Sequence, residues 1–196
     1  MYNLEYSACL CPVRATEEGI ETLLTKRVYF NKEMDRPMKF PGEWVFAGGM
    51  FSRSDTSLRD TAIREFYEET DYDGDIANTV FLRIGKGPLN GKQHYIAFYG
   101  ARIDDSFSFG GKVNGEVLDT RWMNVDDALS LICSDEFTYE QNKLIAEMGI
   151  NSLAYGDYRI DSRQFPSQVV ETLKLIHSIS TRESRTMCEL KKGLGI

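Results

Sequence analysis

Three glutamates spaced three and four positions apart are the residues best suited to chemistry. Glu65, Glu68 and Glu69 lie in the stretch RDTAIREFYEETDY. Successive residues of a helix turn by about 100°, so the three carboxylates share an arc of about 100° on one face. Carboxylates grouped in this way repel one another. A hard divalent cation with oxygen ligands reverses the sign of that interaction, so the spacing indicates a metal site, with magnesium favoured where phosphate oxygens complete the ligands.

The residues ahead of the glutamates strengthen this interpretation. An acidic, solvated helix face is the common alternative for such a pattern on its own. Here the pair Gly48-Gly49 follows a short apolar strand, and we expect a turn whose backbone can approach a ligand closely. Arg64 can hold one carboxylate through paired hydrogen bonds. Asp55 lies between the glycines and the helix as a capping acid.

The stretch over residues 48–72 resembles the Nudix box, which runs Gly, five residues, Glu, seven residues, Arg-Glu-apolar-x-Glu-Glu-x-Gly-apolar. The matching residues are Gly49, Arg64, Glu65, Phe66, Glu68, Glu69 and Tyr72. Asp55 stands where Glu is usual, one extra residue separates it from Arg64, and Asp71 replaces the late glycine. The last departure is mild, because Asp tolerates the left-handed conformation expected just past a helix.

The first two departures resemble the coenzyme A pyrophosphatase branch of that family. Members of this branch also carry a strand like LLTKR, here residues 23–27, and a run like G-x-W-V-F-P-G-G, here residues 42–49 with Ala47 in place of proline. The resemblance implies a hydrolase that cuts the pyrophosphate of a nucleoside diphosphate linked to another group, with CoA or acyl-CoA favoured. ADP-ribose, NADH and dinucleoside polyphosphates are the alternative substrates. A nucleotide-sensing module that binds without cutting is the alternative outside enzymes.

The resemblance also implies roles for individual residues. Glu65, Glu68 and Glu69, with the Gly48 carbonyl, would bind Mg²⁺ or Mn²⁺, and Arg64 would orient the glutamates. Asp55 would support the loop or reach the metal through water.

Two acids are candidates for the general base, Glu65 and Glu116. In many members a glutamate placed like Glu116, ahead of a tryptophan like Trp122, reaches the metal site, and a solvated loop acid is the alternative. Lys26, Arg27 and Gly49 are the candidate contacts to substrate phosphate, although a solvated strand end explains the two cations equally well.

The remaining pattern predicts an α+β fold, and the resemblance implies a Nudix-type α/β/α sandwich with a mixed central sheet. Strands are expected at residues 4–14, 20–30, 44–46, 76–84, 93–103 and 117–123, and helices at 57–70, from 126 and from about 166. Residues 31–43, 85–88 and 90–91 are expected to be loops. We expect one Nudix domain over residues 1–180 and a flexible or helical tail over 181–196.

Composition limits the partners. The 196 residues carry a net charge of -7, which argues against broad nucleic-acid binding. No apolar run approaches the roughly 20 residues needed to span a bilayer, and the N-terminus lacks the pattern of a secretory signal. The four cysteines fit neither a zinc site nor a redox pair, and we expect buried, free thiols. These features predict a cytoplasmic protein without a nucleic-acid or membrane partner. The family resemblance implies a small-molecule nucleoside diphosphate substrate and allows a homodimer.

Overall fold

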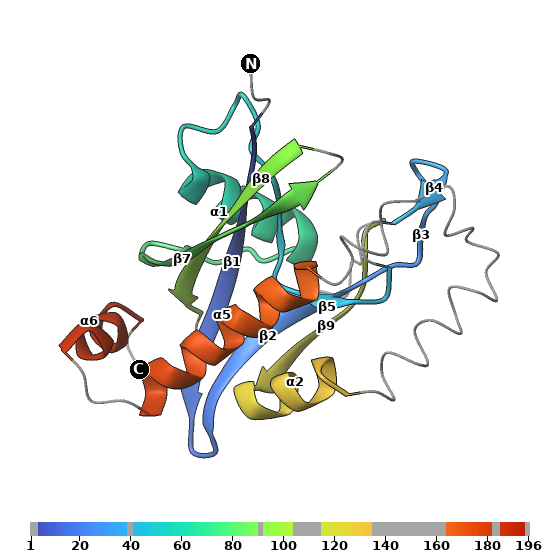
Figure 1. Ribbon diagram of the computed structural model, residues 1–196. Coiled ribbons are helices and arrows are strands. Elements are labelled where there is room, and N and C mark those ends of the chain that lie inside the picture. Colours follow the sequence, from blue (N-terminus) through green and yellow to red (C-terminus); the bar gives the residue numbers. More distant parts are fainter. Residues whose placement is uncertain are drawn as a thin grey trace.

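A single mixed sheet forms the centre of the computed structural model, which describes residues 4–38, 41–89, 92–103, 115–134, 164–181 and 185–194. The described strands of this sheet are β1 (Glu5–Thr16), β2 (Gly19–Arg27), β5 (Trp44–Val45), β6 (Gly48–Met50), β7 (Thr79–Leu89), β8 (Lys92–Arg102) and β9 (Val117–Asn124). They run in the order β5-β2-β1-β8-β7, with β6 beside β1 and β9 beside β2 (Figure 1). β1 is parallel to β8 and antiparallel to β2, so the sheet is mixed as predicted.

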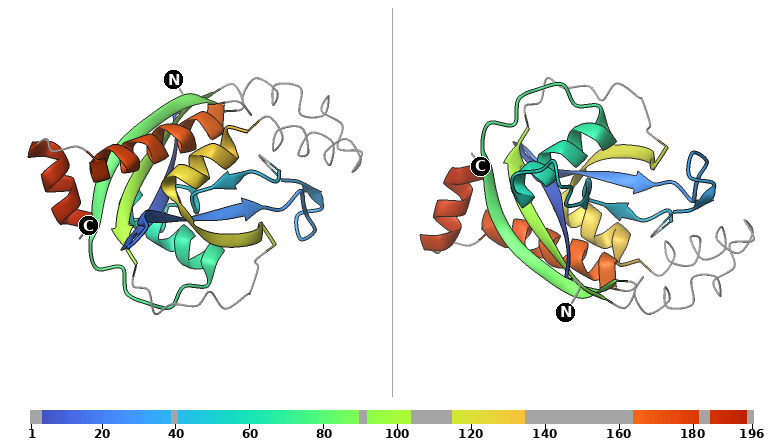
Figure 2. Two further views of the ribbon diagram at one scale, coloured as in Figure 1. Left: turned by 90° about the horizontal axis from the view of Figure 1, so that it is seen from below. Right: turned by 90° about the horizontal axis from the view of Figure 1, so that it is seen from above.

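Helices cover both faces of this sheet. α1 (Leu58–Thr70) lies on one face, and α2 (Val125–Ile132) and α5 (Gln164–Thr181) lie together on the other (Figure 2). Alternate residues of β1 serve the two sides: Ala8 and Leu10 belong to the core under α1, whereas Cys9 and Cys11 belong to the core under α5. The expected α/β/α sandwich is therefore confirmed.

Local capping residues define the two ends of α1. Ser57 is the N-cap, and its hydroxyl accepts a hydrogen bond from the N–H of Asp60 at 3.2 Å. Asp71 adopts the left-handed conformation at the C-cap, with φ of 54°, and its N–H donates to the carbonyl of Tyr67. The left-handed conformation of Asp71 was predicted from the sequence, and the two caps fix which turn of the helix carries the glutamates.

Three sequence expectations about loops were wrong. Residues 85–88 continue β7, which is the last strand in the described sheet order, and an edge strand tolerates a proline because one side of its backbone needs no neighbour. Gly48 and Gly49 form β6 instead of a turn, pairing with Cys9 and Ala8. The region 31–43 holds part of a small hairpin of β3 (Phe30–Asn31) and β4 (Arg36–Pro37). Residues 90–91 lie outside the described ranges.

The C-terminal region adds one more helix. α6 (Arg185–Leu194) occupies most of the segment expected as a tail. Leu194 at its end is fully buried and belongs to the core under α5. Cys9 and Cys11 are buried free thiols as expected, whereas Cys133 is exposed at the end of α2. None of the helices in the described ranges combines the length and the apolar character that a membrane crossing requires.

Candidate active site

The three glutamates of α1 lie at one cleft but differ in exposure. Glu69 is buried, with 5% of its surface exposed, whereas the side chains of Glu65 and Glu68 are 17% and 57% exposed. The cleft has a volume of about 230 Å³. Five carboxylates line it, those of Glu33, Glu65, Glu68, Glu69 and Glu116, together with Asn31, Met34 and Gly115. The helix thus brings the predicted metal-ligand side chains to one concave surface, with Glu116 on its other wall.

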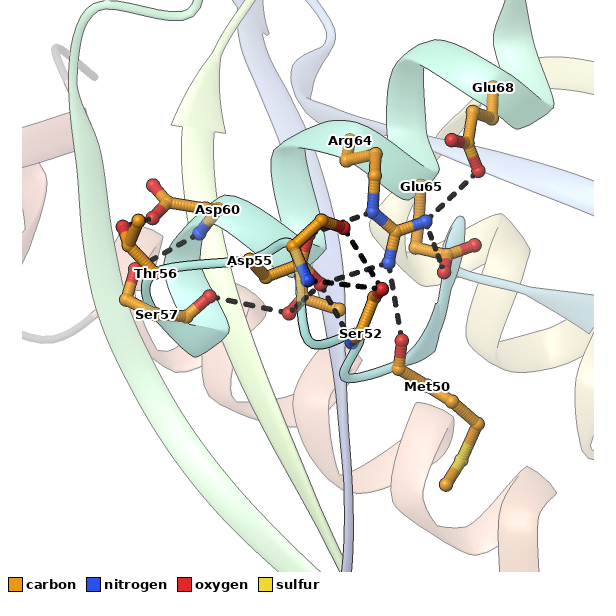
Figure 3. A network of polar contacts seen from close by, with 11 residues as sticks. Met50, Ser52, Asp55, Thr56, Ser57, Asp60, Arg64, Glu65 and Glu68 are labelled. Atoms are coloured by element: carbon orange, nitrogen blue, oxygen red, sulfur yellow. Dashed lines mark hydrogen bonds and ion pairs between the residues drawn. The ribbon is translucent and has the colours of Figure 1, made fainter.

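Arg64 organises the approach to this cleft (Figure 3). Its guanidinium donates to both carboxylate oxygens of Asp55, from Nε at 2.9 Å and from Nη2 at 3.0 Å. Nη2 also donates to the carbonyl of Met50 at 3.2 Å. Nη1 pairs with Glu65 at 2.8 Å and with Glu68 at 3.0 Å. One side chain therefore joins the loop after β6 to two of the three glutamates, and its role in orienting them during the reaction stays a prediction.

Asp55 closes the loop that begins after β6. Its side chain is only 4% exposed, and Oδ2 accepts hydrogen bonds from the N–H of Ser52 at 2.9 Å and from the hydroxyl of Thr61 at 2.8 Å. The hydrogen bonds from Arg64, aided by those from Ser52 and Thr61, hold the pKa of Asp55 well below its ordinary value. Asp55, which is shorter than the glutamate usual at this position of the box, therefore supports the loop. Its Oδ1 accepts from Arg64 Nε, and its Oδ2 accepts from three donors.

Glu69 is the least compensated acid of the cluster. Burial, reinforced by the charges of Glu65 and Glu116, raises its pKa to about 8, although Arg27 acts in the opposite direction. The N–H of Gly48 donates to Glu69 Oε2 at 3.3 Å. Gly48 therefore contacts the cluster through its N–H, and the role of its carbonyl as a metal ligand stays a prediction. Burial also raises the pKa of Glu65.

The two glycines are required by close packing and not by a turn. A Cβ on Gly49 would collide with the carboxylate of Glu65. A Cβ on Gly48 would meet the backbone of β1 and lie 2.6 Å from Cys9 Sγ. Neither residue has a positive φ, so the strand conformation itself does not demand glycine. β6 can therefore run directly beneath the glutamates only without side chains at these positions.

Glu116 lines the cleft and contacts Arg27, Asn31 and Val28. Its Oε2 lies 3.5 Å from Arg27 Nη2, and its Oε1 accepts a hydrogen bond from Asn31 Nδ2 at 3.4 Å. Its backbone carbonyl accepts from the N–H of Val28 at 3.0 Å. Glu116 is therefore fixed beside the α1 glutamates, although more than forty positions separate them in the chain.

The two candidate phosphate-binding cations lie apart. Arg27 contacts Glu116 and acts on the charge of Glu69, so it serves as a counterion within the site. Lys26 lies over the ring of Trp44, 5.8 Å from its centroid, and Trp44 belongs to the core on the opposite sheet face. The alternation of side chains along β2 explains the separation. The structure brings Arg27 to the site and does not bring Lys26 there.

The donor set fits a hard divalent cation. Five carboxylates line one cleft, and carboxylate oxygens are the ligands that Mg²⁺ and Mn²⁺ prefer. Glu69 is buried with an incompletely compensated charge, which a cation would neutralise. Within the described ranges no three Asp, Glu, His or Cys side chains already form a ready cage, because Arg64 engages both Glu65 and Glu68. These two carboxylates would have to turn from Arg64 toward Glu69.

Comparisons with known proteins give a family match and structures with a similar fold. The family model described as NUDIX domain matches residues 6–146. Among solved structures, a C. elegans Ap4A hydrolase in a binary complex shares 17% identity, covering 74% of this chain and 98% of that one, with a TM-score of 0.51. A mutT/nudix family protein from Listeria innocua shares 20% identity over 79% and 99% of the two chains, with a TM-score of 0.50. No curated protein matches. At these identities the structural likeness concerns the fold alone.

Proposed function

This chain belongs to the Nudix family, and from that premise we propose that it is a metal-dependent pyrophosphohydrolase of nucleoside diphosphates linked to another group. The observation that carries the proposal is the cleft in which buried Glu69 lies beside four further glutamates. Such a concentration of negative charge repels an anionic pyrophosphate unless cations are bound with it. The site is therefore suited to a reaction in which metal and phosphate enter together.

Each part of the site has a role in that reaction. Glu65, Glu68 and Glu69 would hold Mg²⁺ or Mn²⁺, which when bound neutralises phosphate oxygens and lowers the pKa of a water molecule. Arg64 pairs with Glu65 and Glu68 in the metal-free site, and its contacts to Asp55 and Met50 would keep it beside these carboxylates when they turn toward the metal. Gly48 and Gly49 leave room for the glutamates above β6.

Glu116 is the better placed of the two candidate bases. Glu65 is engaged by Arg64 at 2.8 Å and belongs to the proposed ligand set. Glu116 lies on the facing wall, where its carboxylate can accept the proton of a water that attacks phosphorus within the cleft. We therefore propose Glu116 as the general base, with Arg27 and Asn31 beside it.

The substrate proposed first is CoA or an acyl-CoA. The support is the resemblance of residues 23–27, 42–49 and the Asp55-containing box to the coenzyme A pyrophosphatase branch. ADP-ribose, NADH and dinucleoside polyphosphates are the next candidates. Hydrolysis of CoA at its pyrophosphate would release 3′,5′-ADP, which distinguishes it from the other substrates.

The test measures product release from a panel of CoA, acetyl-CoA, ADP-ribose, NADH and a dinucleoside polyphosphate, with and without Mg²⁺. We expect Mg²⁺-dependent release from at least one compound, and at least a ~100-fold loss in Glu69→Gln with the fold intact. Glu171→Gln removes a carboxylate of the exposed pair with Lys174 on α5 and serves as the matched control. Saturable binding without release would favour a sensor, and full activity of Glu69→Gln would contradict the metal site.

A further inference from the structure

Asn31 is a buried polar residue on β3 with contacts to two separate segments. It is only 1% exposed. Its Oδ1 accepts hydrogen bonds from the N–H groups of Glu33 and Met34, each at 3.0 Å, and so forms the turn of the β3–β4 hairpin. Its Nδ2 donates to Glu116 Oε1 at 3.4 Å, across 85 positions of the chain. The same amide therefore shapes the rim of the cleft and contacts its acid.

The two ends of this side chain require an amide. Oδ1 must accept and Nδ2 must donate, and an aspartate at this position could only accept. Arg27 Nη2 lies 3.5 Å from the other oxygen, Glu116 Oε2. With a donor near each oxygen, at 3.4 and 3.5 Å, one orientation of the Glu116 carboxylate is favoured, and its backbone carbonyl accepts from Val28. Removal of the Asn31 donor would take away the contact to Glu116 Oε1.

On the basis of the hydrolase function proposed above, we propose that Asn31 is a positioning residue that aims the Glu116 carboxylate into the cleft and joins it to the turn of the β3–β4 hairpin. Glu33 and Met34, whose N–H groups Asn31 binds, also line the cleft. A shift of the hairpin therefore moves the cleft rim and Glu116 together. Proton transfer to Glu116 then depends on Asn31, although Asn31 itself neither accepts nor donates a proton in the reaction.

Asn31→Asp separates the two roles of this side chain. The carboxylate keeps the acceptor for Glu33 and Met34 but replaces the donor by a negative charge beside Glu116. With CoA and ADP-ribose as substrates, we expect a fall in kcat of ~10-fold or more, the usual cost of losing such a support, with little change in KM. The buried charge beside Glu116 should also lower the thermal midpoint. Asn31→Ser, which keeps a weaker turn acceptor without new charge, should reduce kcat in the same direction.

The control makes the same chemical change elsewhere. Asn124 caps α2 through its Oδ1 to the N–H of Asp126 and donates Nδ2 to the carbonyl of Glu18, far from the cleft lining. Asn124→Asp preserves the cap acceptor, and we expect kcat to stay within about twofold of the parent. An equal loss in Asn124→Asp and Asn31→Asp would overturn the proposal, because it would trace the effect to a general perturbation.

A double-mutant cycle tests whether Asn31 acts through Glu116. In the Glu116→Gln background, Asn31→Asp should cause no further loss of kcat, and chemical unfolding of the four proteins should show coupling between the two positions. Additive effects in both measurements would overturn the proposal. Since the unfolding cycle needs no turnover, it remains informative if Glu69→Gln contradicts the hydrolase function. Full activity of Asn31→Asp beside an inactive Glu69→Gln would reject this inference alone.

Discussion

At the scale of single residues, the site is a balance between carboxylates and two arginines. Arg64 engages three acids on the side of α1, whereas Arg27 pairs with Glu116 and acts on the charge of Glu69. Asp55 receives strong compensation and has a lowered pKa, whereas Glu69 receives little and has a raised one. The same chemical group is therefore fully paired at Asp55, whereas at Glu69 a cation would be needed to neutralise it.

The raised pKa of Glu69 makes a prediction about stability and pH. Its pKa is about 8 in the folded protein and near the ordinary value of 4.5 in the unfolded chain. Between these values the folded protein holds a proton that the unfolded chain has lost, so stability falls as pH rises. A difference of one pKa unit corresponds to about 1.4 kcal/mol of stability. At this chain length, a loss of 1 kcal/mol lowers the thermal unfolding midpoint by about 2–4 °C. We therefore expect the midpoint of the metal-free protein to fall by at least about 3 °C between pH 5.5 and 8.

Thermal unfolding in a chelating buffer checks this prediction. Glu69→Gln should flatten the dependence, because a neutral amide has no proton to lose, and the surface variant Glu171→Gln should keep it. Addition of Mg²⁺ at pH 8 should raise the midpoint of the parent more than that of Glu69→Gln. An equal slope in the parent and in Glu69→Gln would show that other groups carry the pH dependence.

At the scale of elements, the sequence predicted those parts of the site that depend on local patterns. The 3.6-residue period and the left-handed conformation expected at Asp71 defined α1 and its glutamate face. The strand through residues 85–88 was missed, because Gly and Pro are turn residues unless an edge position accommodates them, and the edge follows from topology. The contact of Asn31 with Glu116 was also missed, since no local signal joins positions 85 apart.

β6 gives a prediction that separates activity from stability. The Cβ of Gly49→Ala would push against the movable carboxylate of Glu65, whereas that of Gly48→Ala would push against the backbone of β1. We therefore expect Gly49→Ala to lose ~10-fold or more in kcat with a small change in midpoint, because displaced ligands cost activity first. Gly48→Ala should lower the midpoint by several degrees, since overpacking costs about 1–3 kcal/mol.

Parallel kinetics and thermal unfolding of the two variants provide the measurement, and each variant is the control for the other. The prediction would be contradicted if Gly49→Ala kept parental kcat or if both variants lost stability equally. Either outcome would mean that the carboxylate of Glu65 does not depend on the missing side chain.

At the scale of the whole molecule, the fold assigns separate tasks to its two faces. The core under α1 lies below the acidic cleft, and the core under α5 is closed by α2, α5 and the end of α6. Lys26 and Arg27, adjacent in sequence, belong to different faces for this reason. The sequence predicted this sandwich through its resemblance to the Nudix box, but a domain end near residue 180 stays a prediction.

Leu194 tests where the cooperative domain ends. It is fully buried, and one of its methyl groups lies 2.6 Å from where a Cβ on Gly100 of β8 would stand. Truncation of a buried leucine to alanine costs about 2–5 kcal/mol, so Leu194→Ala should lower the thermal midpoint by about 5–15 °C. We expect kcat to stay unchanged, because the cleft lies on the other face of the sheet. Lys192→Ala, at an exposed position of α6, is the control. If the two variants unfold at the same temperature, α6 stands outside the cooperative unit and the domain ends before it; if they differ as expected, the unit includes α6.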